Sequence, residues 1–411
     1  MAASDNFPWR RNLYSVTAAS FIGFTGFTLV MPFLPLYFEQ LGVSDVGEIS
    51  LWAGMSLGVT PAITAFMAPL WGRLADRHGR KIMVERSLVS FVVVMAAMAF
   101  VSRPWHVFAL RAIQGLFAGY GALALAMAAD SAPKEHTAYA IGFVQTAQRL
   151  GPALGPVFGG LVAQAVGLRR AFFVTSAFYA VALILMAVGY DERAVVKRAG
   201  DADSDGRVSF KSILAFENFV LLMVVIFGLQ FVDRSFGPVL PLFVAGLGVD
   251  SHAVPLIAGL LFSIAAGAAA AGNQLCGRLL QNGSARSAIA TTCGVAAVGV
   301  AGFLVTRSAW WLMLPTAVFG VGIGAATTAA YTAATAVIPS NARGTGFGLL
   351  TTASLVGLAV SPIASGLLGA SSIRAVFAVD AVMLGALAIA VKRLMIAEPL
   401  PKPSTPAPEE L

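Results

Sequence analysis

Long apolar stretches, separated by short polar or charged intervals, follow one another along nearly the whole chain. Each has about twenty residues, which at about 1.5 Å per residue suffices for a helix to cross a lipid bilayer. The intervals predict a polar linker at 191–217 and a proline-rich, disordered tail at 397–411. The stretches predict twelve membrane-spanning helices at residues 13–38, 49–71, 82–102, 106–129, 139–166, 171–190, 218–245, 253–276, 286–306, 309–335, 345–369 and 373–395.

Composition agrees with this pattern. Of the 411 residues, 58% are hydrophobic and 11% are charged, whereas a soluble domain has about 25% charged residues. The net charge of +7 comes from groups in the predicted loops, so it indicates membrane topology and predicts no nucleic-acid partner. The lipid bilayer is the expected surrounding of the protein.

The positions of the basic residues predict the orientation. With the N-terminus inside, nineteen of the 27 Lys and Arg residues fall on the cytoplasmic side, five outside and three within spans. Because cytoplasmic loops are enriched in Lys and Arg, this bias predicts that both termini are cytoplasmic. An odd number of spans would remove the bias.

The two halves of the chain repeat each other. The segment PFLPL at 32–36 recurs as PVLPL at 238–242, an offset of 206 residues. The repeat predicts an all-α polytopic membrane protein with twelve transmembrane helices in two pseudo-symmetric six-helix bundles. The predicted parts are an N-terminal bundle at 1–190, a cytoplasmic linker at 191–217, a C-terminal bundle at 218–396 and the tail. A substrate site is then expected between the bundles near the membrane midplane, with alternating access by rocking of one bundle on the other.

One charged segment, GRLADRHGRK at 72–81, separates the second and third apolar stretches. It predicts a tight aqueous turn, in which glycines permit a sharp turn and close helix approach, and Asp76 pairs with arginines or faces a helix N-terminus. Asp130, at the end of the fourth stretch, is expected to pair with these arginines. The second half carries Gln281 and Ser284 in place of Asp76 and Gly79, so we expect the first half to supply most of the gating energy. The predicted gating residues are Gly72, Asp76, Arg77, Gly79, Arg80 and Asp130.

At these residues the chain resembles the major facilitator superfamily, whose loop between helices 2 and 3 reads G-x-L-A-D-R-x-G-R-K. The fourth stretch carries Arg111, Gln114 and Gly115, which resemble the superfamily motif R-x-x-Q-G. The resemblance implies that Arg111 faces the cavity and is linked to proton coupling, with Gln114 on the same helix face. The alternative is an arginine that reaches the outer headgroups.

The fifth stretch resembles the drug:proton antiporters of that superfamily through the pattern G-x8-G-x3-G-P-x2-G-G. A face of small residues lets helices pack closely, and prolines permit bending. The resemblance implies a monomeric bacterial inner-membrane exporter of small amphipathic molecules, energised by the proton gradient without other cofactor. No phosphate-binding loop of the ATP-dependent kind is present, so we expect no ATP. The residues of the pattern are Gly142, Gly151, Gly155, Pro156, Gly159 and Gly160.

Charged residues deep in predicted spans are the remaining candidates for the substrate and proton pathway. They are Arg149 in the fifth span and Asp233 and Arg234 in the seventh, beside Arg111. Asp233 is the first candidate for a proton-titrating carboxylate, and the alternative is a structural salt bridge to Arg149 or Arg111. Because adjacent helical residues diverge by about 100°, at most one of Asp233 and Arg234 should point squarely into the cavity. Asp380 ranks lower, since the twelfth span is expected at the periphery. Three arginines against one aspartate predict a positive cavity that favours anionic or neutral substrates.

The sequence leaves two alternative functions open and argues against a third. An exporter or importer of one metabolite, such as an organic anion, sugar or siderophore, remains the alternative on the same fold, and a receptor without transport is a further one. An enzyme would need a polar catalytic cluster at one membrane depth, and the histidines and cysteines supply none. The acidic run at 201–206 imitates a calcium loop, but Ser212 stands at its twelfth position, so we expect no metal.

Overall fold

The computed structural model describes residues 9–133, 136–191, 214–282, 284–339 and 343–396, without the side chains of 69, 76, 138, 277–282, 343 and 344. Most of the predicted linker, including the acidic run, and the predicted tail lie outside the described residues. The helices are α1 (Trp9–Leu29), α2 (Leu34–Gln40), α3 (Val46–His78), α4 (Arg80–Met98), α5 (Pro104–Phe117), α6 (Tyr120–Ser131), α7 (Thr137–Val166), α8 (Leu168–Gly189), α10 (Phe219–Gly246), α11 (Val254–Asn282), α12 (Ala285–Val305), α13 (Met313–Val337), α14 (Arg343–Ser371) and α15 (Ile373–Leu394).

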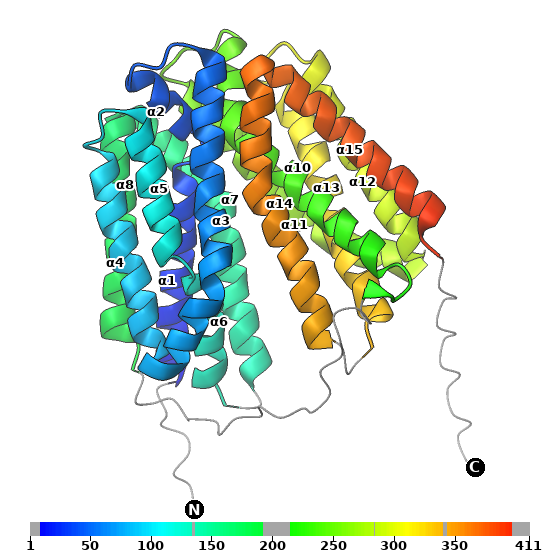
Figure 1. Ribbon diagram of the computed structural model, residues 1–411, viewed down its shortest axis with the longest axis horizontal. Coiled ribbons are helices and arrows are strands. Elements are labelled where there is room, and N and C mark those ends of the chain that lie inside the picture. Colours follow the sequence, from blue (N-terminus) through cyan, green and yellow to red (C-terminus); the bar gives the residue numbers. More distant parts are fainter. Residues whose placement is uncertain (1–8, 134–135, 192–213, 283, 340–342, 397–411) are drawn as a thin grey trace, which may run out of the picture.

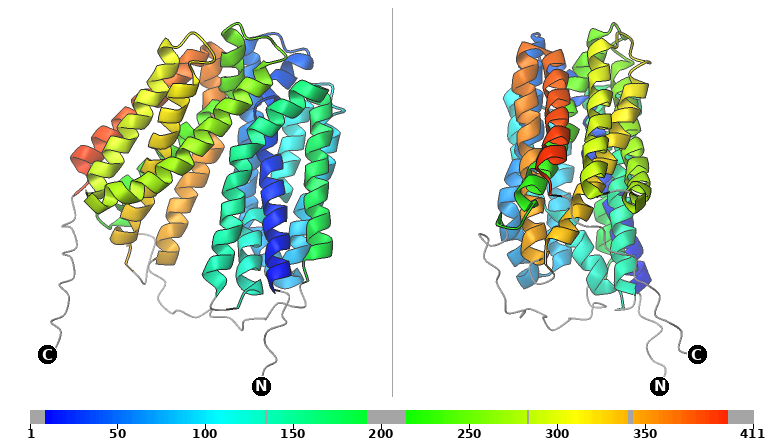
Figure 2. Two further views of the ribbon diagram at one scale, coloured as in Figure 1. Left: turned by 180° about the vertical axis from the view of Figure 1, so that it is seen from behind. Right: turned by 90° about the vertical axis from the view of Figure 1, so that its right-hand side faces the viewer.

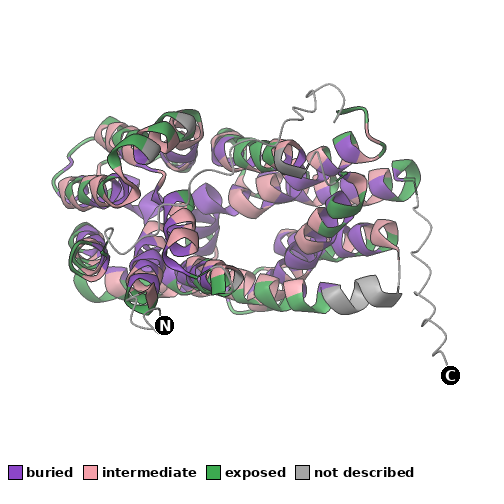
Figure 3. Ribbon diagram, turned by 90° about the horizontal axis from the view of Figure 1, so that it is seen from below, coloured by how far each residue is buried: buried purple, intermediate pink, exposed green. Residues whose placement is uncertain are grey.

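All twelve predicted spans correspond to helical segments, with α1 and α2 forming one bent span and α5 and α6 one interrupted span (Figure 1). Within the described residues, nine segments are long and apolar enough to cross a membrane, or ten if the pair α1–α2, bent by 47°, counts as one. The first half and the second half each form one bundle, side by side in Figure 2. Seen end-on, exposed residues follow the outer helix faces and buried residues lie within the bundles (Figure 3), as expected for a protein that presents its outer surface to lipid.

The charged segment at 72–81 differs from its prediction as an aqueous turn. Helix α3 continues through it to His78, α4 begins at Arg80, and Gly79 alone is non-helical, with φ of +95°. Basic residues in the last turn of α3 favour this extension, because they complement the helix dipole. Gly79 makes the sharp turn as predicted, but Gly72 does not permit a close approach, since a Cβ there would meet nothing within 4 Å.

The fourth span is broken in its middle, although its apolar pattern predicts one continuous helix. Helix α5 ends at Phe117, and Gly119, with φ of +124°, precedes α6. The carbonyls released at the break find side-chain donors, as a membrane interior requires. The Trp71 indole donates to the Leu116 carbonyl at 2.7 Å, and Arg86 donates to the Phe117 carbonyl at 3.1 Å. Arg86 also stacks on Trp71, with its guanidinium 3.4 Å from the ring centroid.

The two bundles meet at one end and separate at the other (Figures 1 and 2). We call the end with Gly79 and Asp130 the latch face, and the end with Asp45 and Ser371 the distal face. Toward the distal face, α3 packs on α14 and α7 packs on α11. Small residues make these contacts: a Cβ on Gly54 would lie 2.8 Å from the Gly366 Cα, and one on Gly160 would lie 2.5 Å from the Pro255 carbonyl oxygen.

The glycine pattern of α7 serves the packing against α1 at Gly151, Gly155 and Gly159 and against α11 at Gly160, but its first position packs on nothing. A Cβ on Gly151 would lie 2.8 Å from the Thr25 backbone nitrogen, and one on Gly155 would lie 2.6 Å from the Thr25 carbonyl oxygen. Gly159 similarly abuts the Leu29 carbonyl, whereas a Cβ on Gly142 would meet nothing within 4 Å. The prediction of a close-packing small face is thus confirmed from Gly151 onward and wrong for Gly142.

This difference gives a matched pair of variants. Gly155→Ala should lower the free energy of unfolding by about 1–3 kcal/mol, because the new methyl meets backbone that cannot yield. Gly142→Ala should change it by less than about 0.5 kcal/mol. Denaturant titration in mixed micelles measures both, and equal midpoints for the two variants would contradict the packing described.

Candidate functional site

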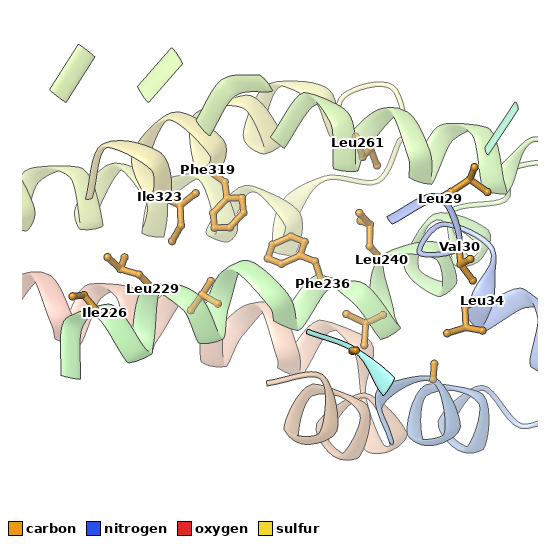
Figure 4. Close-up of a cluster of buried hydrophobic side chains, with 14 of the residues drawn as sticks. Leu29, Val30, Leu34, Ile226, Leu229, Phe236, Leu240, Leu261, Phe319 and Ile323 are labelled. Atoms are coloured by element: carbon orange, nitrogen blue, oxygen red, sulfur yellow. The ribbon is translucent and has the colours of Figure 1, made fainter. Parts of the chain in front are cut away.

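A small cavity of about 100 Å³ lies between the bundles. The first half lines it with Thr28, Met31 and two prolines of α7, and the second half with residues of α10, α11 and α13. Its walls are mainly apolar, and Phe236 stacks on Phe319 with ring centroids 4.9 Å apart (Figure 4). Figure 4 also shows Leu240 and Leu261 beside this pair. The position between the bundles is the one that the internal repeat predicts.

Asp233 and Arg234 bring charge into this apolar cavity, and both line it. The Arg234 Nε lies 3.1 Å from an Asp233 carboxylate oxygen, yet the N–H is not directed for a hydrogen bond. Both side chains therefore line the cavity, and they pair with each other from adjacent positions. Asp233 pairs with Arg234, not with Arg149 or Arg111 as the alternative supposed.

A second carboxyl group, that of Asp380, contacts the same helix α10. Ser235, two residues after Asp233, donates a hydrogen bond of 2.5 Å to Asp380 on α15. The Asp380 side chain is 1% exposed, so the twelfth span is not as peripheral as expected at this point. The sequence could not show this contact, because it joins residues 145 positions apart.

Arg111 and Gln114 do not reach the cavity. Both are buried inside the N-terminal bundle, and the Arg111 Nη1 donates to the Gln114 Oε1 at 2.9 Å. This overturns the expectation that Arg111 faces the cavity, and also the alternative that it reaches the outer headgroups. Arg149 is exposed on α7 and is not among the residues that line the cavity.

The cavity consequently carries one positive and one negative side chain. The prediction of a positive cavity is wrong, because it counted every deep arginine as cavity-facing. Two of the three arginines lie elsewhere, and the third is paired. Charge balance removes the reason to favour anionic substrates over cationic ones.

At the latch face the predicted pairing of Asp130 with an arginine is confirmed, since Arg80 donates to its carboxylate. Lys81 donates to the carbonyls of Ala187 and Tyr190 at the end of α8, at 2.8 and 2.7 Å. These contacts join α4 to α6 and α8 within the first bundle. Arg77 is exposed, and the Asp76 side chain lies outside the described part. In the second half, Ser284 caps α12 by accepting a hydrogen bond from the Ser287 backbone at 3.2 Å.

Two bundles of helices with a cavity between them define the fold of a polytopic helical membrane protein. The chain matches the Major Facilitator Superfamily model over residues 16–354 and 305–411. It therefore belongs to the Major Facilitator Superfamily.

Among similar proteins, the multidrug resistance protein MdtG of Yersinia enterocolitica is 34% identical over 64% of this chain and 63% of its own length. The multi-drug resistance efflux pump PmrA homolog of Lactococcus lactis is 34% identical over 66% of each chain. The alignments thus span less than two thirds of these relatives.

Solved structures with the same fold include a bacterial homolog of the human lysosomal transporter Spinster in an inward-facing and occupied conformation. It has a TM-score of 0.75 and 16% identity, over 95% of this chain and 98% of that one. A mutant of the nucleoside transporter NupG has a TM-score of 0.71 and 13% identity, over 93% and 99% of the two chains. At these identities the likeness concerns the fold alone.

Proposed function

We propose that the protein exports small amphipathic drugs in exchange for protons across the bacterial inner membrane. The proton gradient supplies the energy, without ATP or another cofactor, and the monomer is the working unit. Both termini and the latch face are cytoplasmic in this proposal. The observation that carries it is the Asp233–Arg234 ion pair in a mainly apolar cavity between the bundles, and the efflux relatives support the substrate class.

The ion pair suits exchange of a proton for a substrate. Binding of a proton at Asp233 neutralises the carboxylate and releases Arg234 from its partner. A polar or charged group of the substrate then competes with the proton for the same residues, while the aromatic walls accept its apolar part. Since each ligand weakens binding of the other, one leaves as the other enters.

In this proposal the glycine contacts near the distal face keep the cavity closed from outside, and the separated latch face is the inward-facing side. A cavity of about 100 Å³ is smaller than drug sites, which have about 300–1,000 Å³. The bundles or their side chains must therefore move apart to admit a drug. The return to the outward-facing state requires the α3–α14 and α7–α11 contacts to open.

Proton flux in proteoliposomes that contain a pH-sensitive dye tests the proposal. The proton flux that each drug of a cationic, neutral and anionic panel produces is compared with the flux in empty liposomes. We expect several chemically unrelated drugs to drive proton movement opposite to their own. A response to one metabolite alone would indicate a narrow carrier, such as one for an organic anion, sugar or siderophore. Drug transport without proton movement would contradict the coupling.

A further inference from the structure

Four polar side chains meet inside the N-terminal bundle without enough partners. Arg111 and Gln114 come from α5, Tyr120 from α6 and Tyr179 from α8, and they are 2%, 0%, 7% and 0% exposed. The Arg111–Gln114 hydrogen bond uses the acceptor oxygen of the amide. Within the described part of the chain, the Arg111 Nε and Nη2, the Gln114 Nε2 and both tyrosine hydroxyls have no hydrogen-bond partner. We call these four residues the donor cluster.

The members of the donor cluster lie near one another. The Phe91 ring touches both tyrosines, with centroids 6.1 Å from Tyr120 and 5.1 Å from Tyr179. Arg111 and Tyr179 are close enough to interact electrostatically, and so are the two tyrosines. Helix α1 places Gly23 against the Tyr120 hydroxyl. The cluster therefore lies among α1, α4, α5, α6 and α8, apart from the cavity between the bundles.

No carboxylate among the described residues pairs with Arg111. The described acidic side chains of the first half have other partners. Asp130 pairs with Arg80 and Glu85 with Lys81. At the start of α3, Asp45 accepts a hydrogen bond from the Glu48 backbone, and Glu48 accepts one from the Trp52 indole. Glu39 and Asp191 are exposed at helix ends. Leaving a buried cation without a counter-charge is strongly unfavourable. Water could accept the hydrogen bonds, but it would leave the positive charge uncompensated.

We propose that the donor cluster binds a small monovalent inorganic anion of the size of chloride. The guanidinium supplies the counter-charge, and the amide N–H and the two hydroxyls donate hydrogen bonds to the same ion. The ion would stabilise the N-terminal bundle beside the break in the fourth span, since Tyr120 is the first residue of α6. This role is separate from substrate binding at Asp233 and Arg234.

Thermal unfolding of the purified full-length protein in detergent tests the proposed anion site. Bromide is the probe, and gluconate replaces it in the reference samples so that the ionic strength stays constant. We expect a saturable rise of the unfolding temperature with bromide, as a ligand of the folded state produces. Tyr179→Phe removes one donor without changing the shape, so the bromide Kd should rise about tenfold. Arg111→Gln should abolish the bromide effect.

Tyr37→Phe is the matched control. Tyr37 is likewise fully buried in the first half, but its hydroxyl donates to the Met98 carbonyl at 2.8 Å. It should keep the wild-type bromide Kd even where its own stability falls. An unfolding temperature that is the same in bromide and gluconate would overturn the proposal and leave water in the cluster. A bromide effect that Tyr179→Phe leaves unchanged would overturn it too, by placing the ion elsewhere. If Arg111→Gln does not fold, the two tyrosine variants still decide.

Discussion

Asp233→Asn is expected to lower substrate-induced proton flux to the level of empty liposomes. The asparagine side chain has nearly the same shape as aspartate, but it neither carries the charge that pairs with Arg234 nor binds and releases a proton. Substrate should bind more weakly, because asparagine resembles the protonated aspartate, but binding should remain measurable since the aromatic and aliphatic walls of the cavity are unchanged. Flux in the pH-dye liposomes, together with substrate binding to the purified variant, measures the two effects separately.

Substitution of two other carboxylates tests whether the loss of flux is specific to Asp233. Glu39→Gln alters an exposed residue at the end of α2 and should leave the flux unchanged. Asp380→Asn keeps a group that can accept the Ser235 hydrogen bond, so it separates loss of a titratable acid from loss of that contact. If flux survives in Asp233→Asn and disappears in Asp380→Asn, the proton is carried at Asp380 and the assignment to Asp233 is wrong.

The helices could be predicted from the sequence because a membrane span requires an apolar stretch of a fixed length. The repeat of PFLPL as PVLPL likewise indicated two bundles and a site between them. The ends of helices were less predictable, as α3 shows by continuing through its charged residues to Gly79. The break before Tyr120 was missed, since its stabilising donors, Trp71 and Arg86, come from other helices.

The candidate site was predictable in part. Asp233 and Arg234 were identified because charged residues are rare in membrane spans, and rarity is visible in a sequence. The direction in which a deep charge points is set by tertiary packing, so the sequence could not distinguish Arg234 in the cavity from Arg111 inside a bundle. Nothing in the sequence distinguishes Tyr120 and Tyr179 from other aromatic residues in membrane spans. The importance of Asp380 depends on its contact with Ser235, which only the folded structure shows.

Gly54→Leu should hold the bundles apart near the distal face and strongly reduce transport. Gly54 and Gly366 face each other across the α3–α14 contact, where a Cβ on Gly54 would already lie 2.8 Å from the Gly366 Cα. A leucine side chain cannot fit there, so the closed arrangement becomes about 1–3 kcal/mol less favourable. That energy shifts the population between open and closed distal faces by about 5- to 150-fold.

Distances between spin labels at Gln40 and Ser372, with both native cysteines replaced, report the separation of the bundles at the distal face. Both positions are exposed. In Gly54→Leu the longer distances should dominate, whereas Gly294→Leu should resemble the parent protein because a Cβ at Gly294 meets nothing within 4 Å. A transporter needs both arrangements in turn, so a variant that cannot close the distal face should bind substrate but not move it. Unchanged distances and full transport in Gly54→Leu would mean that the α3–α14 contact is not the distal gate.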